Sequence, residues 1–271
     1  MSRRHKSDAP FFLIMSGISS SFILLIVLLL AADVIFASRS DFMAVFRRPE
    51  ILHAFRLTLI TCTISAILSI WVATPLGYIL SRYRFTGRVL MDTIVDIPIV
   101  LPPLVLGLSL LILFHLSIGG WELESWLRDT IRFPVTYQWP AIILAQFTVG
   151  CSFAVRTMSV TFDQIDPRAE DVARTLGCTR GQAFLRVALP QAWRGLIAGT
   201  TIAWARSLGE FGPILVFAGA TRMKTEVLST TVFLELSIGH LDTAVAVSLM
   251  MVVMAVVVLL FLRAIGTGLN P

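Results

Sequence analysis

The sequence predicts an all-α integral membrane protein with about six transmembrane helices. Hydrophobic residues make up 56% of the 271 positions, charged residues only 14%, and the mean hydropathy is +0.83. This composition is unlike that of soluble domains, and a helix of roughly 20 apolar residues satisfies its own backbone polar groups across a bilayer. The predicted spans are Phe11–Phe36, Phe55–Leu80, Ile94–Leu116, Trp139–Ser159, Gly195–Ala218 and Thr243–Leu262.

The first predicted span has two interpretations. A basic start followed by an apolar stretch that ends near Ala31 and Ala32 is also typical of a signal peptide. At about 26 residues the stretch is longer than a usual signal peptide core, so we favour a retained anchor. The chain is then organised as residues 1–54 (cytoplasmic tail, first helix and outer loop), residues 55–262 (a core of five helices) and residues 263–271 (a short cytoplasmic tail).

The distribution of basic residues predicts the orientation in the membrane. Segments rich in Lys and Arg stay in the cytoplasm during insertion. An even number of spans puts both termini on one side, and placing them in the cytoplasm leaves more Lys and Arg in the inner segments than in the outer ones. We therefore expect both termini, and the polar segment 160–194, to be cytoplasmic.

The residue types argue against an enzyme. A phosphate-binding P-loop needs glycines followed by a lysine, but the only lysines are Lys6 and Lys224, and neither follows a glycine. The sequence has no G-x-S-x-G or H-E-x-x-H motif, and its three cysteines and four histidines are scattered over different segments. We expect a transporter subunit without catalytic residues, metal or cofactor of its own, and an unusual intramembrane enzyme is the alternative.

Residues 160–194 form the longest polar segment with a clear pattern. Asp166 before Pro167 predicts the start of a helix, and Gly177 supplies a left-handed stop. Small or apolar residues follow at helical spacing: Ala169, Val172, Ala173 and Leu176. The polar residues of the other face are Glu170, Asp171, Arg174 and Thr175. We expect the apolar stripe to seat this helix against the membrane domain, with the charged face pointing outward.

A second short helix follows in the same segment. Thr179 and Gln182 have the spacing of a capping box, and Pro190 is expected to end the helix. The two helices either lie on the membrane surface as a simple connection or form a rigid projection that fits a groove of a soluble partner. Periodicity alone does not separate these interpretations.

This segment resembles the EAA motif of ABC importer permeases. The matching positions are Asp171, Ala173, Gly177, Val187, Leu189 and Pro190. Asp171 stands where the motif usually has Glu and Val172 where it has its first Ala, but Glu170 directly precedes them. In that family the motif is the coupling helix that docks into the ATPase subunit. The resemblance implies that the coupling residues are Glu170, Asp171, Ala173, Leu176, Gly177, Val187, Leu189 and Pro190.

Two other segments extend the resemblance. Asp96–Gly107 (DIPIVLPPLVLG) resembles the proline-rich third span of molybdate and sulfate permeases, and Leu208–Gly212 (LGEFG) resembles the Gly-Glu-Phe-Gly segment of the same group. Pro98, Pro102 and Pro103 each remove a backbone donor, so this span should face neighbouring helices or a water-filled cavity. A kink with no part in a pathway is the alternative.

The fifth predicted span carries two charges one turn apart. Arg206 and Glu210 would each cost about 2.5–3.5 kcal/mol within a membrane, so we expect them to pair. They form either a structural ion pair or a polar path in which Arg206 attracts an anion. Gly195, Gly199 and Ala203 recur every fourth residue, which favours close packing on a neighbouring helix. The candidate pathway residues are Pro98, Pro102, Pro103, Arg206, Gly209, Glu210 and Gly212.

The resemblance implies a MetI-like permease of a type I ABC importer in the cytoplasmic membrane of a bacterium or archaeon. Such a chain pairs with a second permease copy, with two ATPase subunits that use ATP and Mg, and with an external substrate-binding protein. A tetrahedral oxyanion such as molybdate, tungstate or sulfate is the expected substrate, and a polyamine or ferric iron is the alternative. We expect contact with membrane lipid and none with nucleic acid. A stand-alone channel or secondary carrier would be favoured by an inverted repeat, and we see none.

Overall fold

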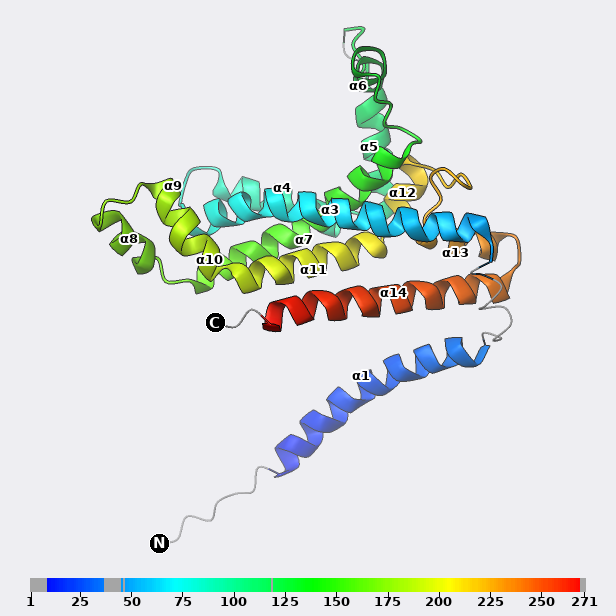
Figure 1. Ribbon diagram of the computed structural model, residues 1–271, viewed down its shortest axis with the longest axis horizontal. Coiled ribbons are helices and arrows are strands. Elements are labelled where there is room, and N and C mark those ends of the chain that lie inside the picture. The colour runs from blue at the N-terminus through cyan, green and yellow to red at the C-terminus, as the bar shows by residue number, and fades with distance from the viewer. Residues whose placement is uncertain (1–8, 37–44, 46, 118, 269–271) are drawn as a thin grey trace.

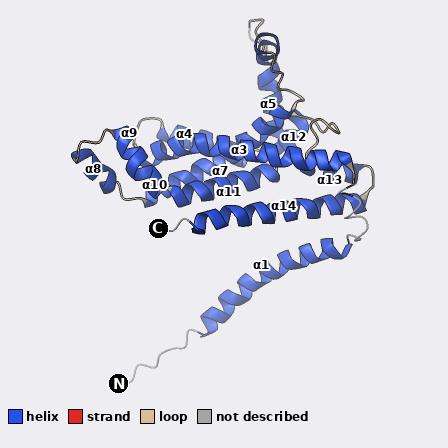
Figure 2. Ribbon diagram, viewed as in Figure 1, coloured by secondary structure: helices blue, strands red, loops and turns tan. Residues whose placement is uncertain are grey.

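The computed structural model describes residues 9–36, 45, 47–117 and 119–268. In this part of the chain the regular elements are helices and no strand is present, so the predicted all-α class is confirmed (Figure 2). The basic tail with Arg3, Arg4 and Lys6 lies outside the described residues, as does the end of the predicted C-terminal tail, residues 269–271.

A layer of long helices forms the body of the protein (Figure 1). α7 packs along α3, α11 contacts both of them, and α14 lies against α11. The first helix, α1, lies outside the layer beside α14, and its apolar side chains are exposed. The bounds of these helices are α1 Ala9–Phe36, α3 Pro49–Arg82, α7 Trp139–Gln164, α11 Trp193–Leu208 and α14 Leu241–Gly268.

Small residues allow the helices of the layer to approach closely. A Cβ atom added to Gly195 would lie 2.2 Å from the Thr161 side chain of α7, and one added to Gly199 would lie 2.9 Å from Ile70 of α3. Ala203, on the same side of α11, is fully buried. The predicted close packing of this helix is therefore confirmed.

Two predicted spans are wrong as continuous helices. The third is split into α4 (Arg88–Val100) and α5 (Pro103–His115), whose axes differ by 113°. The fifth is split into α11, which ends at Leu208, and the short α12 (Gly212–Phe217). Within the described residues, four helices are long and apolar enough to cross a membrane, or five if the bent pair is one span.

Adjacent prolines cause the break between α4 and α5. A residue that precedes proline is pushed out of the helical region, because the proline ring collides with its backbone. Leu101 precedes Pro102 and has a ψ of 140°, and Pro102 precedes Pro103 and has a ψ of 134°. Pro98, in contrast, lies inside α4. The break turns α5 away from the layer (Figure 1).

The shorter helices gather at the two ends of the layer. α8, α9 and α10 lie at the end where α14 finishes, and α12 and α13 lie towards the other end (Figure 1). The remaining bounds are α6 Leu123–Trp126, the π-helical turn η1 Leu127–Ile131, α8 Arg168–Thr175, α9 Arg180–Ala183, the π-helical turn η2 Phe184–Ala188, α10 Leu189–Gln191 and α13 Leu228–Ser237.

Candidate functional site

The predicted start and stop of the first loop helix and the predicted start of the second are confirmed. The Asp166 carboxylate accepts a hydrogen bond from the backbone N–H of Arg168 at 3.0 Å, at the start of α8. Gly177 has a φ of +95° just after α8, a conformation that favours glycine. Thr179 and Gln182 form the capping box of α9, with reciprocal bonds of 2.9 and 3.3 Å.

Pro190 does not end the second helix, contrary to prediction. α9 continues through the wide turn η2 into α10, which finishes at Gln191. In η2 the Leu189 backbone N–H donates to the carbonyl of Phe184, five residues earlier. A proline has no N–H and crowds the carbonyl four residues before it, and a π-helical turn just ahead accommodates both defects.

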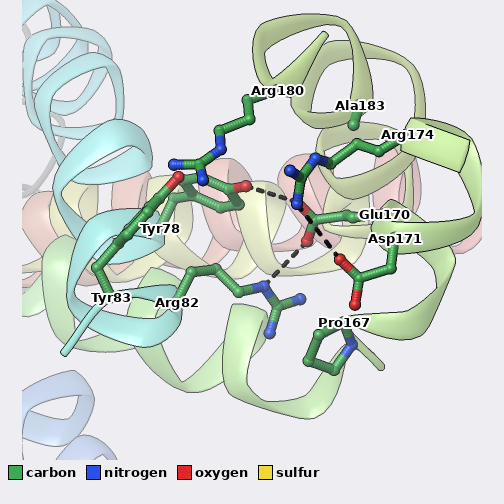
Figure 3. A pocket seen from close by; sticks show the side chains of 9 residues that line it. All are labelled: Tyr78, Arg82, Tyr83, Pro167, Glu170, Asp171, Arg174, Arg180 and Ala183. Carbon is green, nitrogen blue, oxygen red and sulfur yellow. Dashed lines mark hydrogen bonds and ion pairs between the residues drawn. The ribbon is translucent and has the colours of Figure 1, made fainter. Parts of the chain in front are cut away.

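Glu170 fastens α8 to the end of α3 (Figure 3). Its carboxylate accepts a hydrogen bond from the Tyr78 hydroxyl at 2.5 Å and one from Arg82 Nε at 3.0 Å. The Arg82 Nη2 atom also donates to the carbonyl of Ile165 at 2.9 Å, just before α8. Glu170 is only 7% exposed, so the carboxylate is held by two donors away from bulk solvent.

Aromatic packing stabilises the cluster of Glu170, Tyr78 and Arg82, which we call the clamp. The Tyr78 ring lies 5.3 Å from the ring of Phe162 in α7 and 4.6 Å from the ring of Phe184 in η2, measured between centroids. Tyr78 therefore joins α3, α7, η2 and, through its hydroxyl, α8. Beside the clamp is a cavity of about 180 Å³, with Arg174 and Arg180 on its wall (Figure 3).

The orientation predicted for α8 is wrong. Val172 and Leu176, expected to seat the helix, are 58% and 81% exposed, whereas Glu170, expected on the outer face, is buried. Burying a carboxylate without its partners would be costlier than exposing two apolar side chains. The hydrogen bonds from Tyr78 and Arg82 therefore set the rotation of the helix and leave the apolar residues facing outward.

The predicted coupling residues fall into three groups. Glu170 is the buried anchor. The partly buried residues are Ala173, Val187 and Leu189. The exposed residues are Asp171, Leu176, Gly177 and Pro190. The Asp171 carboxylate forms an ion pair with a neighbour on its own helix, Arg174, with 3.6 Å between Oδ1 and Nη1.

The proline-rich and glycine-rich segments contact each other at the two helix breaks. A Cβ atom on Gly212 would lie 2.8 Å from Cβ of Pro103, and one on Gly107 would lie 2.8 Å from Cα of Pro213. Each glycine thus leaves room for the proline of the other segment. The two motifs, about a hundred positions apart in the sequence, together form one close contact between α5 and α12.

The predicted pair of Arg206 and Glu210 is present. Arg206 Nη2 lies 3.4 Å from Glu210 Oε2, but α11 ends at Leu208, so the pair spans a helix end and not one continuous helix. The Glu210 side chain is 2% exposed and the Arg206 side chain 42%. The guanidinium also lies 5.1 Å from the ring centroid of Phe153, and its buried Nε has no hydrogen-bond partner within the described residues.

Other ion pairs were not predicted. Arg156 joins α7 to α4, with Nη1 2.8 Å from Asp92 Oδ1 and Nη2 2.5 Å from Asp96 Oδ2. At the other end of the layer, Arg222 Nη2 lies 2.6 Å from the buried Glu235. Opposite charges within or beside apolar spans were a usable signal for the first pair, because such charges seldom stay unpaired in a membrane.

Comparison with known proteins relates the chain to importers. The family described as binding-protein-dependent transport system inner membrane component matches residues 73–271. The sulfate transport system permease protein CysT of Escherichia coli K12 is 35% identical over 255 residues, covering 93% of this chain and 90% of that protein. The molybdenum transport system permease protein ModB of Mycobacterium bovis is 34% identical over 232 residues, covering 83% and 85%. The molybdate/tungstate permease WtpB of Thermococcus kodakarensis is 35% identical, covering 63% and 62%.

Solved structures agree on the fold. A chain of a bacterial ABC transporter that imports the acidic polysaccharide alginate superposes with a TM-score of 0.74, covering 97% of this chain and 98% of that one at 20% identity. The same kind of transporter in complex with an alginate-bound periplasmic protein gives a TM-score of 0.71. The chain belongs to the family of binding-protein-dependent transport system inner membrane components, the permease subunits of ABC importers.

Proposed function

We propose that this chain forms the path of a tetrahedral oxyanion across the cytoplasmic membrane, driven by ATP hydrolysis in separate subunits that dock on α8. The observation that carries the proposal is the geometry of α8. This helix is fixed to the membrane domain by one buried carboxylate, and it leaves Val172 and Leu176 exposed at the end of the molecule.

An exposed apolar pair on a firmly held helix suits the transmission of force. Val172 and Leu176 lie one turn apart, so they form a contact that can enter a groove of a soluble partner. Glu170, through Tyr78 and Arg82, ties the same helix to α3, so a displacement of α8 is passed to a long helix of the layer. The partner supplies ATP and Mg chemistry, and this chain supplies a mechanical link.

Arg206 is the group that we assign to the oxyanion path. Its side chain is partly exposed in the last turn of α11, which stops at Leu208 before α12 begins at Gly212. Glu210 and Phe153 each hold one side of the guanidinium. A cation held in this way adds positive potential where the helices are interrupted, which attracts sulfate, molybdate or tungstate. The named substrates of the CysT, ModB and WtpB relatives support this choice.

The proposed assembly contains two copies of this chain, two ATPase subunits and an external binding protein. The periplasmic protein bound to the similar alginate transporter supports the last partner. α8–α10 and the end of α14 lie at one end of the layer (Figure 1), so a cytoplasmic docking loop also places the C-terminal end of α14 in the cytoplasm. We assign the N-terminus to the same side.

Docking is tested by co-purification of the ATPase with Gly177→Asp and with a matched control, Gly181→Ala. Gly177 needs a positive φ, so the substitution distorts the end of α8, whereas Gly181 has open space around it. We expect the ATPase to be lost from the first variant and kept by the second. Equal retention by both variants would refute docking through this helix.

The substrate is tested by uptake in proteoliposomes that contain the permease and its ATPase. ATP is supplied on the ATPase side and the binding protein on the other, and labelled molybdate and sulfate are compared. ATP-dependent uptake of one or both is expected. Uptake of neither, with ATP hydrolysis intact, would remove the oxyanion assignment and leave the importer assignment standing.

A further inference from the structure

The cavity beside the clamp has more positive than negative charge in its wall. Its volume is about 180 Å³, and its charged lining residues are Arg82, Arg174, Arg180, Glu170 and Asp171. Arg82 donates to Glu170 at 3.0 Å, and Arg174 lies 3.6 Å from Asp171. Within the described residues, no carboxylate forms an ion pair with Arg180. The two pairs compensate themselves, so the guanidinium of Arg180 is the excess charge.

This cavity is within reach of a partner that docks on α8. Arg174 and Arg180 are both exposed, so a group from outside can approach the wall that they form. Figure 3 shows the Arg180 side chain extending from α9 towards the side of the cavity where Tyr83 lies. The outward apolar pair, Val172 and Leu176, belongs to the same helix as Arg174. The cavity therefore continues the docking surface assigned to α8.

We propose that the ATPase subunit places one carboxylate side chain, of an Asp or a Glu, in this cavity against Arg180. The proposal rests on the proposed docking of that subunit on α8. A guanidinium binds a carboxylate with two parallel hydrogen bonds, which fixes the orientation of both groups. Val172 and Leu176 then supply the apolar part of the contact, and Arg180 sets the register of the partner on the helix.

A free tetrahedral oxyanion fits the charge of the cavity less well. Sulfate, molybdate and tungstate each carry two negative charges, whereas the wall offers one uncompensated guanidinium. The carboxylates of Glu170 and Asp171 also line the cavity, and they repel a dianion more strongly than a single negative charge. A carboxylate side chain carries one negative charge. Charge complementarity therefore favours an acidic side chain of the partner.

The test is carbodiimide cross-linking in the assembled complex of this chain with its ATPase. A carbodiimide joins an amine directly to a carboxylate, without a spacer, so it reports contact between the two groups. The chain has only two lysines, Lys6 and Lys224, and Arg180→Lys adds an amine at a known position. We expect an amide between position 180 and an Asp or Glu of the ATPase, identified by peptide mass spectrometry. Arg186→Lys, exposed but outside the cavity, is the control and should give none.

Titration with the ATPase measures how much the contact contributes. Arg180→Gln should weaken binding roughly fivefold at low salt, the upper range for an ion pair that keeps contact with water. High salt should reduce this difference, because it screens the attraction. The control Arg186→Gln should change binding by less than about twofold. Arg180 is exposed, so its substitution should leave the melting temperature unchanged and the loss attributable to the contact.

The outcomes separate this proposal from docking itself. If the ATPase is lost from Gly177→Asp but binds Arg180→Gln as tightly as the wild type, and no amide forms at position 180, docking on α8 stands and the acidic contact is refuted. If the ATPase does not bind the wild type, both proposals fail. Sulfate binding to the chain without its ATPase, lost in Arg180→Gln, would show that a free anion occupies the cavity and would also overturn the proposal.

Discussion

Two buried carboxylates of this protein are held in different ways. Glu170 receives a hydrogen bond from Tyr78 and another from Arg82, and both members of its ion pair are about 10% exposed. Glu210 is buried at least as deeply, but the one ionic contact it makes with a described residue is 3.4 Å long, and the side chain of that partner, Arg206, is 42% exposed. The Glu170 carboxylate is held by two hydrogen-bond donors. The Glu210 carboxylate pairs with a guanidinium, that of Arg206, which stays partly exposed.

This difference separates a structural anchor from a site that is ready for a ligand. A buried charge with full partners holds two elements in a fixed relation, and removing one partner is costly. A half-exposed cation beside a helix break keeps hydrogen-bonding capacity that an anion can use. We therefore assign force transmission to Glu170 and substrate attraction to Arg206.

Replacing the anchor should have the largest effect on stability. Glu170→Ala leaves Arg82 buried without its carboxylate, and we expect a loss of about 3–5 kcal/mol, typical of a broken buried pair. The melting temperature in detergent measures this loss. Asp171→Ala, one residue further and exposed, is the control and should change stability by less than about 0.5 kcal/mol. Similar effects of the two substitutions would contradict the anchor role.

A smaller loss is expected where the two helix breaks meet. Gly212→Ala places a Cβ atom 2.8 Å from Pro103, and such overpacking costs about 1–3 kcal/mol. The matched control Gly181→Ala adds a methyl group in open space and should be neutral or slightly stabilising. A melting temperature unchanged by Gly212→Ala would show that this contact between α5 and α12 is looser than described.

Substitution of Arg206, the partly exposed cation, should affect transport more than stability. Arg206→Gln leaves the buried Glu210 carboxylate without its cation but still offers it an amide donor, so we expect a loss of about 1–3 kcal/mol, smaller than that for Glu170→Ala. Oxyanion uptake should nevertheless fall by roughly tenfold, the effect of losing about 1.4 kcal/mol of attraction, and Arg206→Lys should restore part of it. If Arg206→Gln lowered the melting temperature enough to explain the whole loss of uptake, the pair would be purely structural.

The smallest change in stability is expected on the outward face of α8. Leu176→Asp alters a side chain that is 81% exposed, so the free energy of unfolding should change by less than about 0.5 kcal/mol. The melting temperature checks this. Retention of the ATPase should fall by roughly tenfold if Leu176 enters the partner. Ile238→Asp, an exposed apolar position at the other end of the layer, is the control and should retain the ATPase.

Local signals in the sequence predicted much of this molecule. Gly177, and the capping box of Thr179 and Gln182, act over a few residues and were placed correctly. The ion pair of Arg206 with Glu210 followed from the cost of charge in a membrane. These features depend on short-range geometry or on one strong energetic term, so no knowledge of the three-dimensional packing was needed.

Features that depend on distant residues were not predicted. The rotation of α8 is set by Tyr78 and Arg82, about ninety positions away in the sequence, and the apolar periodicity of α8 alone indicated the opposite face. The break at Pro102 was expected as a kink, but its angle of 113° depends on the packing of α5 against α12. Periodicity reports which face is apolar and not which molecule covers it.

The most direct test of the central claim is site-specific photo-cross-linking in the assembled transporter. A photoreactive amino acid is placed at Leu176, on the outward face of α8, and separately at Met223, which is exposed in the loop between α12 and α13. We expect a covalent adduct with the ATPase subunit from position 176 and none from position 223. No adduct from position 176 in a complex that hydrolyses ATP, or an adduct from position 223 alone, would contradict docking of the ATPase on α8.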